Sequence, residues 1–266
     1  MLIDAHAHVD RFGPDRSRAL TSAVREIRDR RIPTVANSMD TESFERIVSL
    51  AAGCPWILPA FGIHPWNAPH YADRLRELDG LADRAPVIGE IGLDRRFVDD
   101  PACYPAQEKV FRHLLVKAKA RNKIVILHTA GAESESLSAL EESGNERVVV
   151  HWYSGPADIF SQMADRGFYF TVGLEVWHSD RIQRIAREIP AERLLSETDN
   201  PGGPKWLTGK PGNPMLIREV VRGLARIRRT SVRVMEETIQ RNILELIGRD
   251  PALADFRKRI EGWEER

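Results

Sequence analysis

The stretch MLIDAHAHVD, residues 1–10, opens the chain and decides which fold to expect. The apolar residues Met1–Ile3 lead into His6 and His8, a pattern typical of a short buried strand. Side chains two residues apart on a strand point to the same face, which places Asp4, His6 and His8 together. Two imidazoles on one face can bind one metal ion, but a metal site needs three or more ligands. The rest of the chain must therefore supply further ligands.

The remainder of the chain repeats this pattern of a short apolar run followed by a longer amphipathic stretch. Eight strands are expected, at Leu2–His6, Thr34–Asn37, Ile57–Phe61, Val87–Glu90, Ile124–Leu127, Val148–Val150, Phe168–Thr171 and Leu194–Ser196. Helices are expected between them, at Ser17–Arg30, Ser43–Ala51, Ala72–Arg84, Pro105–Ala120, Ser134–Glu142, Ala157–Ala164 and Asp180–Arg187. Strands that alternate with helices pair in parallel, and eight such units fit an α/β TIM (β/α)8 barrel. The alternative, a doubly wound open sheet, is disfavoured because no GxGxxG motif follows the first strand.

The chain beyond the eighth strand is expected to form a long loop and then extra helices. Residues 199–214, DNPGGPKWLTGKPGNP, contain four prolines and four glycines and therefore predict a loop. C-terminal helices are expected at Met215–Arg229, Val232–Ile247 and roughly Pro251–Gly262. The sequence contains no internal repeat and no linker, so residues 1–266 are expected to form a single domain.

Composition and charge restrict the class of protein. Lys+Arg and Asp+Glu both number 39, and this zero net charge argues against a broad nucleic-acid surface while allowing a local basic rim. Cys54 and Cys103 make no disulfide framework and lie in no CxxC motif, which favours a reducing, cytoplasmic location. There is no apolar run of membrane-spanning length and no secretory signal, so no membrane association is expected.

Potential metal ligands stand where the predicted strands end, which is where functional groups gather in a parallel barrel. They are His6 and His8 after the first strand, His64 after the third, Glu90 and Asp94 after the fourth, His128 after the fifth, His151 after the sixth, and Glu197 and Asp199 after the eighth. The other three histidines, His70, His113 and His178, lie in helix-like or loop stretches and are interpreted as ordinary polar residues. Imidazole and carboxylate ligands without a thiol suit zinc, manganese, cobalt or nickel.

The number of ligands predicts two divalent ions rather than one, because six groups exceed what a single tetrahedral ion needs. Two ions about 3.5–4 Å apart can clamp a phosphoryl group and together activate a water. Glu90 is the expected bridge between them, and Asp199 is expected to ligate one ion and take the proton from the attacking water. His64 is equally consistent with a substrate-facing residue and with a turn residue fixed by Pro65. Glu197 is expected to orient a ligand, and Asp94 to anchor a loop.

Six of these segments, taken in order, resemble the successive motifs of the TatD family of metal-dependent hydrolases. They are DAHAH (4–8), FGIHPW (61–66), VIGEIGLD (87–94), ILHT (126–129), VVVHWYSG (148–155) and SETDNP (196–201), followed by QRNILELIG (240–248). The resemblance implies a TIM barrel, divalent metal cofactors (zinc, manganese, magnesium, cobalt or nickel) and phosphodiesterase activity, often 3′–5′ exonuclease activity on DNA. It also implies a set of metal positions, namely His6, His8, Glu90, His128, His151 and Asp199.

The expected substrate is DNA or another phosphodiester, and no obligate protein partner is evident. Arg95, Arg96 and Lys205 lie in predicted loops at the strand ends and are candidate phosphate ligands. Two alternatives stay open: a metal-dependent hydrolase of an amide, lactone or aminoacyl ester on the same barrel, and a metal-stabilised partner protein with little catalysis. Barrels of the first kind often bridge their metals with a modified lysine at a strand end, whereas Lys123 precedes its strand.

Overall fold

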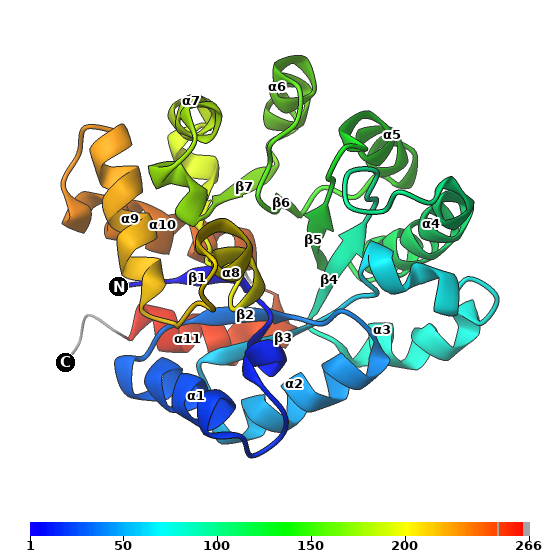
Figure 1. Ribbon diagram of the computed structural model, residues 1–266, viewed down its shortest axis with the longest axis horizontal. Coiled ribbons are helices and arrows are strands. Elements are labelled where there is room, and N and C mark those ends of the chain that lie inside the picture. Colours follow the sequence, from blue (N-terminus) through cyan, green and yellow to red (C-terminus); the bar gives the residue numbers. More distant parts are fainter. Residues whose placement is uncertain (249, 263–266) are drawn as a thin grey trace. The chain divides into compact units, whose positions relative to one another are not determined.

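The structure is a computed structural model and describes residues 1–248 and 250–262 (Figure 1). The domain expected over 1–266 therefore includes residues 249 and 263–266, which lie outside the described residues. By their internal packing the residues form two compact units. Unit 1 comprises residues 1–36, 46–59 and the described residues from 171 onward, and unit 2 comprises residues 37–45 and 60–170. The expectation of a single domain stays a prediction.

In the part of the chain that the structure describes, eight strands form one sheet in chain order. They are β1 (Asp4–Ala7), β2 (Thr34–Asn37), β3 (Ile57–Phe61), β4 (Val87–Gly92), β5 (Ile124–His128), β6 (Val148–Val150), β7 (Tyr169–Val172) and β8 (Leu194–Ser196). The pairing of β1 with β2 and the successive pairings from β3 to β7 are parallel. Parallel strands in strict chain order with helices between them are the topology of a (β/α)8 barrel, so the predicted fold class is confirmed.

Helices follow the strands along the chain. The α-helices are α1 (Arg18–Arg30), α2 (Thr41–Gly53), α3 (Asp79–Arg84), α4 (Tyr104–Ala120), α5 (Glu133–Ser143), α6 (Ala157–Asp165), α7 (Asp180–Glu188), α8 (Gly202–Thr208), α9 (Leu216–Ile227), α10 (Val232–Ile247) and α11 (Ala254–Glu261). Short 3₁₀ helices are η1 (Val9–Phe12), η2 (Pro65–His70), η3 (Leu75–Leu78), η4 (Pro101–Cys103), η5 (Leu174–Trp177), η6 (Ala191–Arg193) and η7 (Pro251–Leu253). None of the helices described is long and apolar enough to cross a lipid bilayer.

The helix predicted over Ala72–Arg84 is wrong in its first half, where a turn and η3 stand, whereas its second half forms α3. The chain leaves helical geometry at Arg74, whose φ is −129°. The Arg74 guanidinium folds back and donates to the carbonyl oxygen of His70, closing a turn before η3 begins.

The loop predicted over 199–214 is also corrected, since it contains α8. Pro204 lies in the first turn of α8, where a missing N–H breaks no helical hydrogen bond. Gly209 then ends the helix with a φ of +77°, a conformation that glycine adopts without steric cost.

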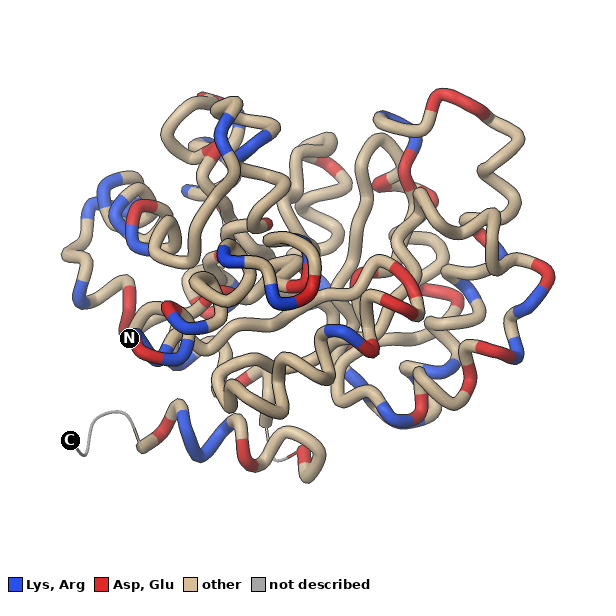
Figure 2. The backbone as a smooth tube through the Cα atoms, turned by 60° about the horizontal axis from the view of Figure 1, so that its bottom comes forward, with Lys and Arg blue, Asp and Glu red and all other residues tan. Residues whose placement is uncertain are grey.

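Each unit buries apolar side chains beneath an exposed surface of mixed charge. In unit 1 one core cluster joins β1, α1, β2 and α2, and its members are Ala7, Val9, Ile27, Ala36, Ile47, Cys54 and Ile57. Lysines and arginines alternate with acidic residues along the helices (Figure 2), in keeping with the zero net charge of the chain.

Two glycines allow the strands of unit 2 to approach closely beside Glu90. A Cβ atom at Gly62 would overlap the Glu90 carbonyl, and one at Gly92 would overlap the His128 carbonyl. Gly92 also has a φ of +149°, which disfavours any other residue. These close approaches bring the ends of β3, β4 and β5 together, and with them Glu90 and His128.

Candidate metal-binding site

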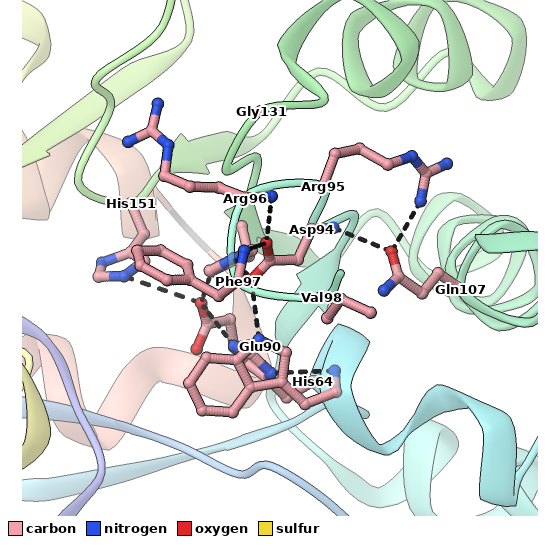
Figure 3. Close-up of polar contacts among 12 residues, drawn as sticks. His64, Glu90, Asp94, Arg95, Arg96, Phe97, Val98, Gln107, Gly131 and His151 are labelled. Carbon is pink, nitrogen blue, oxygen red and sulfur yellow. Dashed lines mark hydrogen bonds and ion pairs between the residues drawn. The ribbon is translucent and has the colours of Figure 1, made fainter. Parts of the chain in front are cut away.

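The Glu90 carboxylate of unit 2 lies close to three imidazoles, those of His64, His128 and His151, of which Figure 3 labels His64 and His151. Its Oε1 atom lies 2.8 Å from Nδ1 of His128, 3.8 Å from Nε2 of His64 and 3.8 Å from Nε2 of His151. Ligand atoms of His64, Glu90 and His128 all lie within 4.8 Å of one another. A buried carboxylate among imidazoles is a donor set that fits a divalent transition-metal ion.

Asp94, two residues beyond the end of β4, contacts the other ring nitrogen of His128. Its Oδ2 atom lies 3.0 Å from Nε2 of His128 and accepts a hydrogen bond of 2.8 Å from the indole N–H of Trp66. A carboxylate that binds one imidazole nitrogen fixes the ring orientation and leaves the other nitrogen for a metal. Asp94 therefore positions His128, a role that the sequence did not predict for it.

Asp94 also organises the loop that follows β4, as the sequence predicted. Its Oδ1 atom accepts hydrogen bonds from the backbone N–H groups of Arg96 and Phe97, at 2.9 and 2.8 Å. Its own backbone N–H donates to Oε1 of Gln107 on α4 at 2.9 Å. One buried carboxylate thus connects the loop and α4 to His128.

The two carboxylates beside His128 favour the charged form of its ring. Burial disfavours the charged ring, but hydrogen bonds to Asp94 and Glu90 outweigh burial and raise the pKa of His128 to about 10. Burial alone would raise the pKa of Asp94. The hydrogen bond and the charge of His128 outweigh burial and lower the pKa of Asp94 to about 2. The two carboxylates therefore favour a positive charge at this position.

A second group of ligand residues lies in unit 1, where β1 and β8 end. Oδ1 of Asp199 lies 3.5 Å from Nε2 of His6 and 3.4 Å from Nε2 of His8. The two imidazoles meet edge to face, with ring centroids 5.1 Å apart. The backbone N–H of Asp199 donates to the His6 carbonyl, and that of His8 donates to the Asn200 carbonyl. These bonds join the two strand ends and hold three potential ligands together.

Two buried carboxylates, Asp4 and Glu197, support this second group. Asp4 accepts hydrogen bonds from the hydroxyl and the backbone N–H of Thr198, at 2.6 and 2.9 Å. Burial raises the pKa of Asp4 to about 7, against the opposing effect of those hydrogen bonds. Glu197 accepts a hydrogen bond of 2.6 Å from the hydroxyl of Thr171 on β7. Asp4 therefore connects β1 to the chain just after β8, and Glu197 connects that segment to β7.

The candidate phosphate ligands lie in different settings. The Arg95 guanidinium donates to Gln107, forms an ion pair with Glu108 at 3.3 Å and lies over the ring of Tyr104, so it points toward α4 (Figure 3). Arg96 points away from α4 and donates to the hydroxyl of Ser154 at 2.9 Å. Lys205 lies exposed on α8.

The remaining histidines lie outside both ligand groups. His113 on α4 forms a hydrogen bond of 2.8 Å with Asp79, His70 ends η2, and His178 follows η5.

Lys123 lies just before β5 and its amine is held by backbone. Its Nζ atom donates to the carbonyl oxygens of Ala82, Asp83 and Ala85, at 2.6, 2.9 and 2.6 Å. These carbonyls end α3, so the lysine caps that helix. A metal-bridging role for Lys123 is inconsistent with this position.

Comparisons with known proteins agree with the ligand pattern. The family described as TatD related DNase matches residues 3–248. Human "Deoxyribonuclease TATDN3" is 26% identical over 262 residues, covering 92% of this chain and 94% of that protein. The Bacillus subtilis "Uncharacterized metal-dependent hydrolase YabD" is 28% identical over 239 residues, covering 86% of this chain and 91% of that protein. The crystal structure of YJJV, a TatD homologue from Escherichia coli, superposes with a TM-score of 0.82 at 25% identity, covering 92% of this chain and 97% of that one. The chain belongs to the TatD family of metal-dependent hydrolases.

Proposed function

We propose that this protein is a divalent-metal-dependent phosphodiesterase that removes nucleotides from the 3′ end of DNA. The observation that carries the proposal is the Glu90 carboxylate oxygen, which lies within 3.8 Å of the imidazoles of His64, His128 and His151. The name of the human relative, a deoxyribonuclease, supports DNA as the substrate.

Each ligand group would hold one divalent ion. His64, Glu90 and His128 form one ligand group, with His151 3.8 Å from Glu90, and His6, His8 and Asp199 form the other. These nitrogen and oxygen donors fit zinc, manganese, cobalt or nickel, and magnesium belongs in the same experimental panel. When bound, two such ions lower the pKa of a water and offset the charge on phosphoryl oxygens. The expectation that Glu90 bridges the two ions stays a prediction.

The side chains of this chain would supply the remaining chemistry. The carboxylate of Asp199 takes the proton of the attacking water, which general-base catalysis requires of a group within hydrogen-bonding reach. The planar guanidinium of Arg96 can donate two parallel hydrogen bonds to a phosphate, and the exposed Lys205 adds a mobile positive charge. Glu197, held by Thr171, keeps the chain just before Asp199 in place.

The test is metal-dependent shortening of a 3′-labelled single-stranded DNA by the wild-type protein, with manganese, magnesium or zinc added. Asp199→Asn and Glu90→Gln are the informative variants, because each removes a charge and preserves the shape of the side chain. Asparagine also tolerates the left-handed backbone of Asp199, whose φ is +51°. Both variants are expected to lose about a hundredfold or more of the activity with the fold intact. Near-normal activity of either variant at normal metal content would contradict the role assigned to that residue.

The same experiment separates the alternatives. A fully metallated protein that cleaves no DNA but hydrolyses small esters or lactones would replace the phosphodiesterase proposal. A rise in melting temperature with metal, and no turnover on any substrate, would favour a metal-stabilised partner protein. The position of Lys123 already argues against the hydrolases whose metals are bridged by a modified lysine.

A further inference from the structure

Two aromatic side chains of unit 2 are exposed together beside the Glu90 cluster. Trp66 is 50% exposed and Phe97 is 49% exposed. Their ring centroids lie 6.4 Å apart with the planes at 72°, so they form an open corner rather than a closed stack. Large aromatic rings ordinarily bury most of their surface, and exposed aromatic groups mark binding surfaces.

One buried carboxylate fixes the indole of Trp66 and the backbone of Phe97. Asp94 accepts the indole N–H of Trp66 at 2.8 Å through Oδ2 and the backbone N–H of Phe97 at 2.8 Å through Oδ1. The backbone N–H of Trp66 also lies 3.3 Å from Nδ1 of His64. The polar atom of the indole is thus satisfied inside the protein while half of the residue surface remains open. Binding to such a held surface costs little side-chain entropy.

The aromatic pair is adjacent to the ligand residues themselves. The ring centroid of Trp66 lies 4.7 Å from that of His64, which lies 4.7 Å from that of His128. Asp94 contacts Trp66 and His128 through the same oxygen. A group bound on the rings would therefore lie next to whatever the Glu90 cluster binds.

We propose that Trp66 and Phe97 form a stacking platform for the nucleobase attached to the phosphate that is cleaved. This inference rests on the proposed phosphodiesterase function and names its substrate class: an unpaired terminal nucleotide that carries a base. Stacking on aromatic rings tolerates every base, because each base has a π face. Arg96, which lies between Asp94 and Phe97 in the chain, places a positive charge on the same loop for the phosphate.

The platform favours single strands over duplex ends. A base at a duplex end must leave its pairing and stacking partners before it can lie on protein rings, and this costs free energy. A base in a single strand has no pairing partner to leave, so the free-energy cost of moving onto the rings is smaller. An abasic phosphodiester gains nothing from the rings, so the presence of the base is the variable that isolates their contribution.

The experiment compares two 5′-labelled single-stranded oligonucleotides that differ only in the 3′-terminal residue. One ends in an ordinary nucleotide and the other in a tetrahydrofuran abasic residue. The metallated wild-type protein is expected to prefer the base-containing substrate by about tenfold or more in kcat/KM. Phe97→Leu should reduce that preference toward one, chiefly by slowing cleavage of the base-containing substrate, with metal content unchanged. Trp66→Leu also removes the indole N–H that Asp94 accepts, so its preference is compared with that of the wild type at matched metal content and should likewise fall toward one. Phe97→Leu keeps the backbone bond to Asp94, so it tests the ring without disturbing the anchor.

Val116→Ala is the control, because Val116 is an exposed apolar residue of the same unit on α4. It lies about 13 Å along the helix from Gln107, where α4 meets Asp94. This variant should keep the wild-type preference. Equal wild-type rates on both substrates, or variants that lose both activities in parallel, would overturn the platform while leaving the phosphodiesterase intact. A metallated wild-type protein that cleaves neither substrate would instead overturn the phosphodiesterase proposal, and the platform with it.

Discussion

The Nε2 atom of His128 lies 3.0 Å from the Oδ2 atom of Asp94, on the opposite side of the ring from Glu90. The imidazole is therefore held by two carboxylates, one through each nitrogen. Because Asp94 also accepts the indole N–H of Trp66, the orientation of His128 is coupled to the aromatic surface beside it. Asp94 thus positions both a proposed metal ligand, His128, and a ring of the proposed base-binding surface, Trp66.

Replacing Asp94 by asparagine is expected to weaken metal binding. The amide has nearly the same shape, but it loses the negative charge that fixes the His128 ring, and such losses commonly reduce metal affinity by about 10- to 100-fold. Competition with a chelator of known affinity measures this change directly. Asp79→Asn is the matched control, because Asp79 binds His113 at 2.8 Å away from the ligand residues. Equal metal affinities for the two variants would contradict a positioning role for Asp94.

The Asp79 carboxylate itself predicts a pH-dependent stability. Hydrogen bonds from Lys117 and then from His113 hold the pKa of Asp79 below its ordinary value. A group whose pKa is lowered by folding stabilises the protein above its unfolded pKa of about 3.9, and that contribution is lost as the pH falls. These three side chains are only partly buried, so solvent screens the ion pairs and Asp79→Asn should lower the free energy of unfolding by about 0.5 kcal/mol at pH 7. Urea denaturation at pH 7 and at pH 3 measures the difference, which should shrink at the lower pH; a difference that grows there would be inconsistent with this ion pair.

Several strands were predictable because a short run of branched apolar residues between turn residues leaves few alternatives. The bounds of β2, β3, β6 and β8 agree with the sequence-based prediction. β1 begins two residues later than predicted, at Asp4, where its backbone N–H meets the Pro33 carbonyl. Strand limits depend on a pairing partner, which lies elsewhere in the chain.

Prediction of the candidate site from sequence is limited in the same way, by contacts between positions far apart in the chain. The local pattern identified Asp94 as a loop anchor, since its contacts with Arg96 and Phe97 span only two or three residues. Its contacts with Trp66 and His128 join positions 28 and 34 residues apart, and no local pattern encodes them. The available signal was a second carboxylate four residues after Glu90, at the end of an apolar strand.

Lys123→Met separates a structural lysine from a metal-bridging one. Methionine keeps most of the apolar stem but removes the three hydrogen bonds to the carbonyls of Ala82, Asp83 and Ala85. Leaving these acceptors without their donor should lower the free energy of unfolding by about 1–3 kcal/mol. Metal content and activity at moderate temperature should be unchanged. Loss of metal from a folded Lys123→Met protein would instead revive the modified-lysine alternative.

Glu197 provides the last prediction, because it lies two residues before Asp199 and is fully buried. The hydroxyl of Thr171 donates to Glu197 at 2.6 Å, and this bond joins β7 to the chain that carries Asp199. Thr171→Val removes the donor and leaves a buried charge less well solvated, which should cost about 1–3 kcal/mol of unfolding free energy. Glu197→Gln keeps an acceptor for Thr171 and removes the charge, so it should cost less stability.

The activities of these variants distinguish a positioning residue from a catalytic one. If Glu197 only keeps the Asp199 segment in place, Glu197→Gln and Thr171→Val should both retain measurable turnover on the labelled DNA, reduced by about tenfold, with metal still bound. Asp199→Asn, measured beside them, should be far less active because it removes the proton acceptor itself. A Glu197→Gln protein that is fully metallated, as stable as the wild type and as inactive as Asp199→Asn would place Glu197 among the groups that handle the proton.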